Sequence, residues 1–251
     1  MHRSGTPNLL LPQRPIPTAR ADSAEVSILK KTWSAQAAGL TDTLGLTYRP
    51  VAVTFSNDEI EAVKPRKAWI CGALKRAALA GEAFVLDGES SACPGGSWHC
   101  GLSEPPAGPA RRALQQFLTR GEKLTASITS FHRMQGLGSP PPTGLAERIY
   151  IGPLAEAPVR PDLVVFLCTA DEACRLVTLD HYWDGVPIHA ELTGSLCHAA
   201  VGYPIATGRT NLTLGDWTAR RTQKYPPDVM ILSVPYERMD NLEAAVPECS
   251  A

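Results

Sequence analysis

The chain has 251 residues, of which 44% are hydrophobic and 20% charged, and its basic and acidic side chains nearly cancel to a net charge of -1. This length and composition can bury a core of ordinary size without disulfide bonds. The near-neutral balance gives no global field that would attract nucleic acid or an anionic membrane. No apolar run approaches the roughly 18 residues of a membrane span, and residues 9–11 are too short for a secretory signal. We expect a cytoplasmic protein with a small-molecule substrate and no nucleic-acid or membrane partner; a homo-oligomer stays open.

Strands and helices alternate along most of the chain. Residues 1–24 are rich in Pro, Arg and Ser and are expected to form a flexible tail. A Pro- and Gly-rich connector at 136–146 would separate a first half, 25–135, from a second half, 147–251. Apolar periodicity and turn residues predict strands at 51–55, 83–86, 162–167 and 229–234, and helices from near Ser23, at 68–80, between 102 and 121, at 171–181 and at 239–246.

The two halves contain a weak internal repeat. Residues 49–55 (RPVAVTF) parallel residues 160–166 (RPDLVVF), and each stretch is followed by a polar turn and a helix. Cys71 and Cys197 occupy matching places, each followed by small residues, a glycine and a strand. The sequence therefore predicts an α/β or α+β fold, a single globular unit built from two related α/β halves with mixed sheets.

The matching cysteines would both lie in the first turn of a short helix. Unpaired backbone N–H groups and the helix dipole favour a thiolate there. If the halves pack about a pseudo-twofold axis, Cys71 and Cys197 converge on one site. The alternative is that a small residue is needed where each helix meets the sheet.

A glycine-rich loop carries a third cysteine. In Cys93-Pro94-Gly95-Gly96 the proline presets a helix or turn, and the glycines let backbone approach a bound group closely. Such a loop can direct the Cys93 sulfur at a cluster or substrate while backbone N–H groups donate to it. A tight connection without function is the alternative.

Together these features resemble the bacterial and archaeal family called domain of unknown function 169. The resemblance covers roughly residues 40 to 245, and the residues that carry it are Cys71, Cys93-Pro94-Gly95-Gly96, Gly101-Leu102, Cys197 and Val234-Pro235-Tyr236-Glu237. It implies that the three cysteines recur as a set. The chain departs from the family pattern at Trp98-His99-Cys100, so that Cys100 is a fourth ligand, a resolving thiol or an incidental substitution.

The remaining cysteines have simpler interpretations. Cys168 ends an apolar strand and Cys174 lies in a helix, and both are expected in the core, while Cys249 is in the C-terminal tail.

Three thiolates from separated segments suit a [4Fe–4S] cluster that leaves one iron open as a Lewis acid or sulfide acceptor. We therefore expect Cys71, Cys93 and Cys197 as metal ligands, the backbone of Gly95 and Gly96 beside the cofactor, and a non-redox reaction such as lyase, hydratase or sulfur-transfer chemistry.

Three other interpretations remain open. Zinc could use the same thiols with His99, Cys100 or His198 as a further ligand. A metal-free thiol enzyme would use Cys93 as nucleophile with His99 or His198 as base, which makes Cys93 and His99 the candidate catalytic residues. A non-catalytic metal- or cofactor-binding regulatory module would use the same pocket without turnover.

Overall fold

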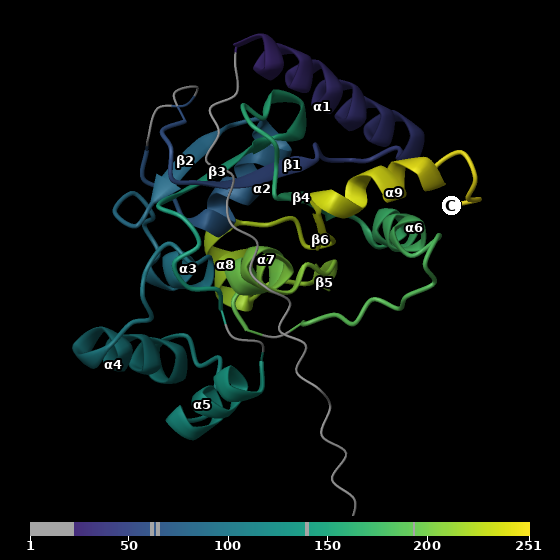
Figure 1. Ribbon diagram of the computed structural model, residues 1–251. Coiled ribbons are helices and arrows are strands. Elements are labelled where there is room, and N and C mark those ends of the chain that lie inside the picture. The colour runs from purple at the N-terminus through teal and green to yellow at the C-terminus, as the bar shows by residue number, and fades with distance from the viewer. Residues whose placement is uncertain (1–22, 61–62, 64–65, 139–140, 193) are drawn as a thin grey trace, which may run out of the picture.

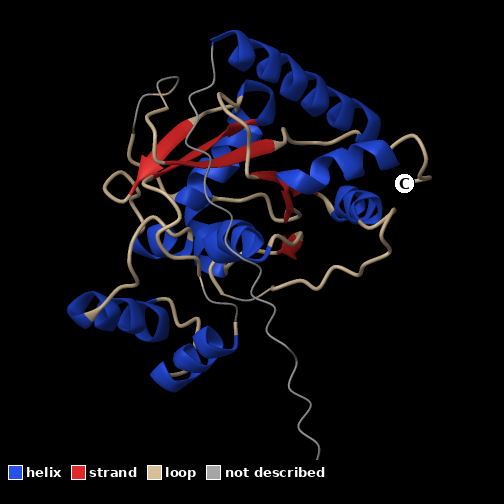
Figure 2. Ribbon diagram, viewed as in Figure 1, coloured by secondary structure: helices blue, strands red, loops and turns tan. Residues whose placement is uncertain are grey.

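The computed structural model describes residues 23–60, 63, 66–138, 141–192 and 194–251. Most of the expected tail, residues 1–22, lies outside the described residues, and residues 23 and 24 already belong to the first helix. Helices pack on both sides of a central sheet (Figures 1 and 2). Among the described helices, none has the length and apolarity needed to cross a membrane.

Six strands form one sheet in the order β2-β3-β1-β4-β6-β5. All neighbouring pairs of these strands are antiparallel, so the prediction of mixed sheets is wrong. The strands are β1 (Val51–Ser56), β2 (Phe84–Asp87), β3 (Arg148–Pro153), β4 (Leu163–Cys168), β5 (Asn211–Thr213) and β6 (Met230–Pro235).

The described helices include a long one at the start of the fold and several shorter ones. They are α1 (Ser23–Leu44), α2 (Ile70–Ala80), α3 (Pro94–His99), α4 (Gly108–Gln116), α5 (Ile128–Leu137), α6 (Ala170–Asp180), α7 (Tyr203–Thr207), α8 (Trp217–Gln223) and α9 (Met239–Ala245). There are two π-helical turns: η1 (Phe117–Gly121) continues α4, and η3 (His198–Gly202) precedes α7. There are also two 3-10 turns: η2 (Leu154–Glu156) follows β3, and η4 (Tyr236–Arg238) follows β6.

Both faces of the sheet are apolar and covered. Val53 and Val165 face a cluster built with α2, η3 and α8, whereas Ala52 and Val164 face a second cluster built with α1, α6 and α9. Alternate residues of a strand point to opposite faces, so a strand covered on both sides becomes a continuous apolar run. The run in β4 therefore reflects its central, doubly covered position, and it carries no information on strand direction.

The strand order is symmetric about the β1–β4 pair. Matching β1 with β4, β2 with β5 and β3 with β6 makes the order the same from either edge. On the face covered by α2, the first half contributes α2 and the second half contributes α7. These two helices are capped by Gly81 and Gly208, both with positive φ. A duplication of two related halves agrees with this order and stays a prediction, as do the limits of the halves.

The expected connector at 136–146 begins inside a helix. The chain forms α5 through Leu137, residues 139–140 lie outside the described part, and residues 141–146 are irregular. Helices α4 and α5 stand at one corner of the molecule, beside α3 (Figure 1).

Candidate functional site

Cys71 is the second residue of α2 and lies in its first turn as predicted, although the helix begins two residues later than expected; only 3% of Cys71 is exposed. The segment before it is fixed by a parallel bridge between Ala68 and Ser91, which brings the start of α2 to the cysteine loop. On the other side, the buried Tyr225 hydroxyl donates a 2.6 Å hydrogen bond to the Cys71 carbonyl. The first turn of α2 is therefore held from two directions.

Cys93 caps the N-terminus of α3. Its sulfur accepts a hydrogen bond from the Gly96 backbone N–H at 3.4 Å, and its carbonyl accepts one from the Ser97 N–H at 3.1 Å. Cys93 is half-buried, so it is the most accessible cysteine of the site. The Cys-Pro-Gly-Gly sequence therefore forms the start of a short helix with a sulfur in the capping position.

Cys197 lies at the start of the helical segment that runs through η3 into α7, and it is buried. The neighbouring Leu196 N–H donates a 2.7 Å hydrogen bond to the Asp216 carboxylate, which also accepts one from the Ala219 N–H at the start of α8. Asp216 thereby ties the beginning of this helical segment to α8.

The three predicted cysteines are brought together with a fourth, Cys100. The thiols of Cys71 and Cys100 hydrogen-bond to the Cys197 sulfur, and Cys93 is close enough to act electrostatically on Cys71 and Cys100. The Cys100 thiol also lies 3.7 Å from the Cys197 carbonyl oxygen. These four residues form what we call the cysteine cluster.

The cysteines of the cluster differ in how easily their thiols ionise. Hydrogen bonds donated by Cys100 and Cys71 lower the pKa of Cys197 well below its ordinary value, against burial, which raises it. The pKa of Cys71 is raised by its hydrogen bond to Cys197 and by burial, and burial raises that of Cys100. The helix start therefore does not lower the pKa of Cys71, and within the cysteine cluster the charged form is favoured more at Cys197 than at Cys71 or Cys100.

Gly96 leaves room between two of the sulfur-bearing side chains. A methyl group on its α-carbon would stand 3.4 Å from the Cys197 sulfur and 3.6 Å from the Cys93 Cβ. A methyl group on Gly95 would stand 3.9 Å from both the Cys93 sulfur and the His99 Nδ1. The two predicted glycines thus let the backbone of α3 lie close to the cysteine cluster and His99, with room for one more carbon at each position.

His99 lies on the same short helix. Its Nδ1 is 2.6 Å from the Gly95 carbonyl oxygen, and because a carbonyl only accepts, we assign the proton to Nδ1. Burial lowers the pKa of His99 to about 4, so the ring is neutral at pH 7 with Nε2 as its acceptor. The ring of His198 lies 5.7 Å from that of His99 and its Nε2 is 3.5 Å from the Glu191 carboxylate.

The other cysteines lie apart from the cluster. Cys168 is buried on the opposite face of the sheet, as expected, and burial raises its pKa to about 12. Cys174 is exposed, so its placement in the core is wrong. The helical period turns Ala173, Leu176 and Leu179 of α6 inward and leaves Cys174 outside.

Within the described part of the chain, no three His, Cys, Asp or Glu side chains stand ready to hold a metal ion. In the cysteine cluster as it stands, the thiols of Cys71 and Cys100 contact Cys197, and Cys93 lies close by. Sequence reasoning missed Asp216 and Tyr225, which carry no signal beyond an Asp at a helix start and an aromatic residue. Cys100 had a signal, its closeness in sequence to Cys93.

The fold and cluster define an α/β protein with one antiparallel sheet and four cysteines gathered on one of its faces. The family called domain of unknown function 169, described as uncharacterised ArCR, matches residues 39–245. The chain belongs to this family, as its cysteine and glycine pattern indicates. No curated protein matches the chain, and no solved structure does.

Proposed function

We propose that the chain is an iron–sulfur protein in which Cys71, Cys93 and Cys197 hold a [4Fe–4S] cluster with one open iron. When bound, such a cluster would supply a Lewis-acidic iron for a non-redox reaction on a small molecule, such as lyase, hydratase or sulfur-transfer chemistry. The observation that carries this proposal is the meeting of thiols from three distant segments beside the space left by Gly96.

The raised pKa values of the cluster thiols are compatible with a bound metal cation. Cys71 and Cys93 both have a raised pKa, the first mainly through its hydrogen bond to Cys197 and the second mainly through burial. A buried group of neutral thiols gains little from further ionisation unless a cation balances it, and a metal deprotonates the thiols that bind it. Binding would replace the S–H contacts at Cys197 by metal–sulfur bonds.

The glycine loop supports a sulfur-rich cofactor. The Gly96 N–H already donates to the Cys93 sulfur, and hydrogen bonds to sulfur are one of the means by which proteins tune iron–sulfur clusters. Cys93 is also the half-buried member of the cysteine cluster, so it would be the cofactor ligand most accessible to solvent.

His99 is the side chain placed to move a proton. Its Nδ1–H is engaged by the Gly95 carbonyl, so Nε2 is the nitrogen that can accept a proton from a substrate. The same hydrogen bond constrains the metal-free alternative, because Nδ1 cannot also take the Cys93 proton and Nε2 would have to serve as the base. The raised pKa of Cys93 weakens it further, since the thiolate is the nucleophile.

The test is purification of the full chain without oxygen, followed by measurement of iron, acid-labile sulfide and thiolate-to-iron absorption. We expect about four iron and four sulfide per chain. Each of Cys71→Ser, Cys93→Ser and Cys197→Ser should lower all three quantities, whereas Cys174→Ser and Cys249→Ser should leave them unchanged.

Circular dichroism identifies variants that fail to fold. A colourless wild-type protein that takes up no iron or sulfide on anaerobic reconstitution would overturn the proposal. So would equal losses in the Cys174 and Cys249 controls.

Zinc is the second candidate, favoured by the contact of Cys100 with Cys197. With Zn–S bonds of about 2.3 Å, tetrahedral sulfurs stand about 3.8 Å apart, which thiols already in contact can approach with small movements. Cys100→Ser separates the two candidates: it should weaken zinc binding strongly and leave the iron and sulfide content of a three-cysteine cluster unchanged.

A further inference from the structure

A small cleft opens beside the cysteine cluster, between α3 and the corner formed by α4 and α5. It has about 80 Å³ of free space. Pockets for drug-sized ligands have about 300–1,000 Å³, so this cleft suits a few heavy atoms rather than a nucleotide-sized molecule. Its lining residues are Trp98, Pro105, Pro106, Arg111, Leu114, Phe131 and Gln135.

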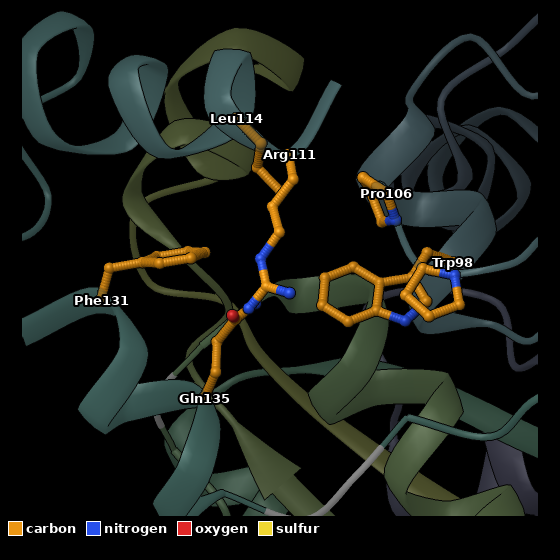
Figure 3. A pocket seen from close by; sticks show the side chains of 7 residues that line it. Trp98, Pro106, Arg111, Leu114, Phe131 and Gln135 are labelled. Atoms are coloured by element: carbon orange, nitrogen blue, oxygen red, sulfur yellow. The ribbon is translucent and has the colours of Figure 1, made fainter. Parts of the chain in front are cut away.

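Polar groups without protein partners point into this space. Figure 3 shows the Arg111 guanidinium extending between the rings of Phe131 and Trp98, with the Gln135 carboxamide near its tip. Among the described residues, the side chains of Arg111 and Gln135 form no hydrogen bond or ion pair with the protein. Arg111 also makes no cation–π contact there, unlike Arg66 over Phe84.

The walls around these groups are apolar. Phe131 is 2% exposed and, with Leu114 and the two prolines, gives the cleft a hydrophobic side. A guanidinium presents a planar fork of donors that matches a carboxylate, and an amide can add one more donor. One cation beside an apolar wall fits a singly charged, planar group with a short hydrocarbon part.

We propose that this cleft binds the carboxylate of a small organic acid, held by Arg111 and Gln135, with its carbon chain or ring against Phe131. The inference deepens the proposed function by naming the substrate class. It rests on that function only for the reaction that follows binding.

The cleft and the cysteine cluster share helix α3. The Trp98 ring lines the cleft and lies against the His99 ring, with ring centroids 4.4 Å apart and the planes tilted by 32°. Trp98 therefore links the cleft with His99, its neighbour on the same short helix.

The experiment is calorimetric titration of the full chain, both as purified without oxygen and after metal removal, with benzoate, propionate, neutral benzamide and inorganic phosphate. We expect both carboxylates to bind and benzamide to bind much more weakly. Arg111→Gln should weaken carboxylate binding roughly tenfold or more, because it removes a charge-assisted pair. The neighbouring Arg112 is exposed like Arg111 but does not line the cleft, so Arg112→Gln is the matched control and should change little.

Gln135→Leu should give a smaller loss in the same direction, and unchanged binding in that variant would remove Gln135 from the proposal. Benzamide binding as well as benzoate, phosphate binding more tightly than either carboxylate, or equal losses in the two arginine variants would overturn it. If the protein binds carboxylates but never contains iron, the carboxylate site is supported and the proposed iron–sulfur cofactor is contradicted. The two proposals can therefore fail separately.

Discussion

Gly96 has no side chain at the point where Cys93 and Cys197 approach each other. A methyl group there meets no atom closer than 3.4 Å, so Gly96→Ala should fold, and as a helical position it should gain helix propensity. The added carbon would nevertheless occupy space beside the Cys197 sulfur. We predict a variant with unchanged or higher thermal stability and a several-fold lower iron and sulfide content.

The control is Gly39→Ala in α1, where a methyl group meets nothing within 4 Å. It should share the gain in stability and keep the cofactor. A Gly96→Ala protein with full iron and sulfide content would show that the space beside Cys197 is not used by a bound group.

Glu172 carries a pH-dependent part of the stability. Burial raises the pKa of its carboxyl, but hydrogen bonds from Thr169 and Thr47 together outweigh burial and bring the pKa below its ordinary value. A depressed pKa gives stability that is present above the ordinary carboxyl pKa and lost as the pH falls through the folded one. Glu172→Gln should therefore destabilise the protein at pH about 7 and flatten its loss of stability towards acid.

Urea unfolding at several pH values measures this effect. Glu104→Gln, in an exposed loop, is the control and should leave the acid profile unchanged. An identical acid profile for wild type and Glu172→Gln would contradict the assignment.

At the residue scale, the sequence indicated the surroundings of several cysteines correctly and was incomplete about the rest. Cys71 and Cys197 could be located because each begins a helical segment rich in small residues that ends at a glycine. The closeness of Cys100 to Cys93 in sequence indicated a role for Cys100, but its contact with Cys197 depends on the turn of α3, which the sequence alone did not specify. Cys174 was placed wrongly because neighbouring residues of a helix point in different directions, so that Ala173 is buried and Cys174 is exposed.

At the scale of elements, α2 and α7 end in the same way. Gly81 has φ 70° and Gly208 has φ 64°, and no side-chain or backbone atom stands closer than 3.7 Å to a methyl group at either position. Gly81→Ala and Gly208→Ala should therefore each cost about 1 kcal/mol through backbone strain alone. Chemical unfolding measures both, and a loss well below that figure at both positions would contradict the left-handed caps.

Elements with strong local signals could be predicted, and those with weak ones could not. The apolar runs of β1 and β4 and the periodicity of α6 were sufficient. Helix α5 was missed because it has few buried residues and follows a polar loop, so its sequence lacks an apolar period. The short helix α8 was missed for a similar reason.

At the scale of the whole molecule, strand direction was the main error. Local sequence shows which strands are buried, but antiparallel pairing depends on where the connections cross, and the apolar runs of β4 and β6 are the same for either direction. The weak repeat led to the expectation that Cys71 and Cys197 converge. The two cysteines do contact each other, and the symmetric strand order agrees with a duplication that stays a prediction.

The central claim is that the cysteine cluster holds iron. The most direct measurement is a crystal structure of protein purified without oxygen, with diffraction data collected at the iron absorption edge. The account predicts strong anomalous density bonded to the sulfurs of Cys71, Cys93 and Cys197, in the space beside Gly96. The claim would be contradicted if that space showed no anomalous density and the thiols of Cys71 and Cys100 were still in contact with Cys197.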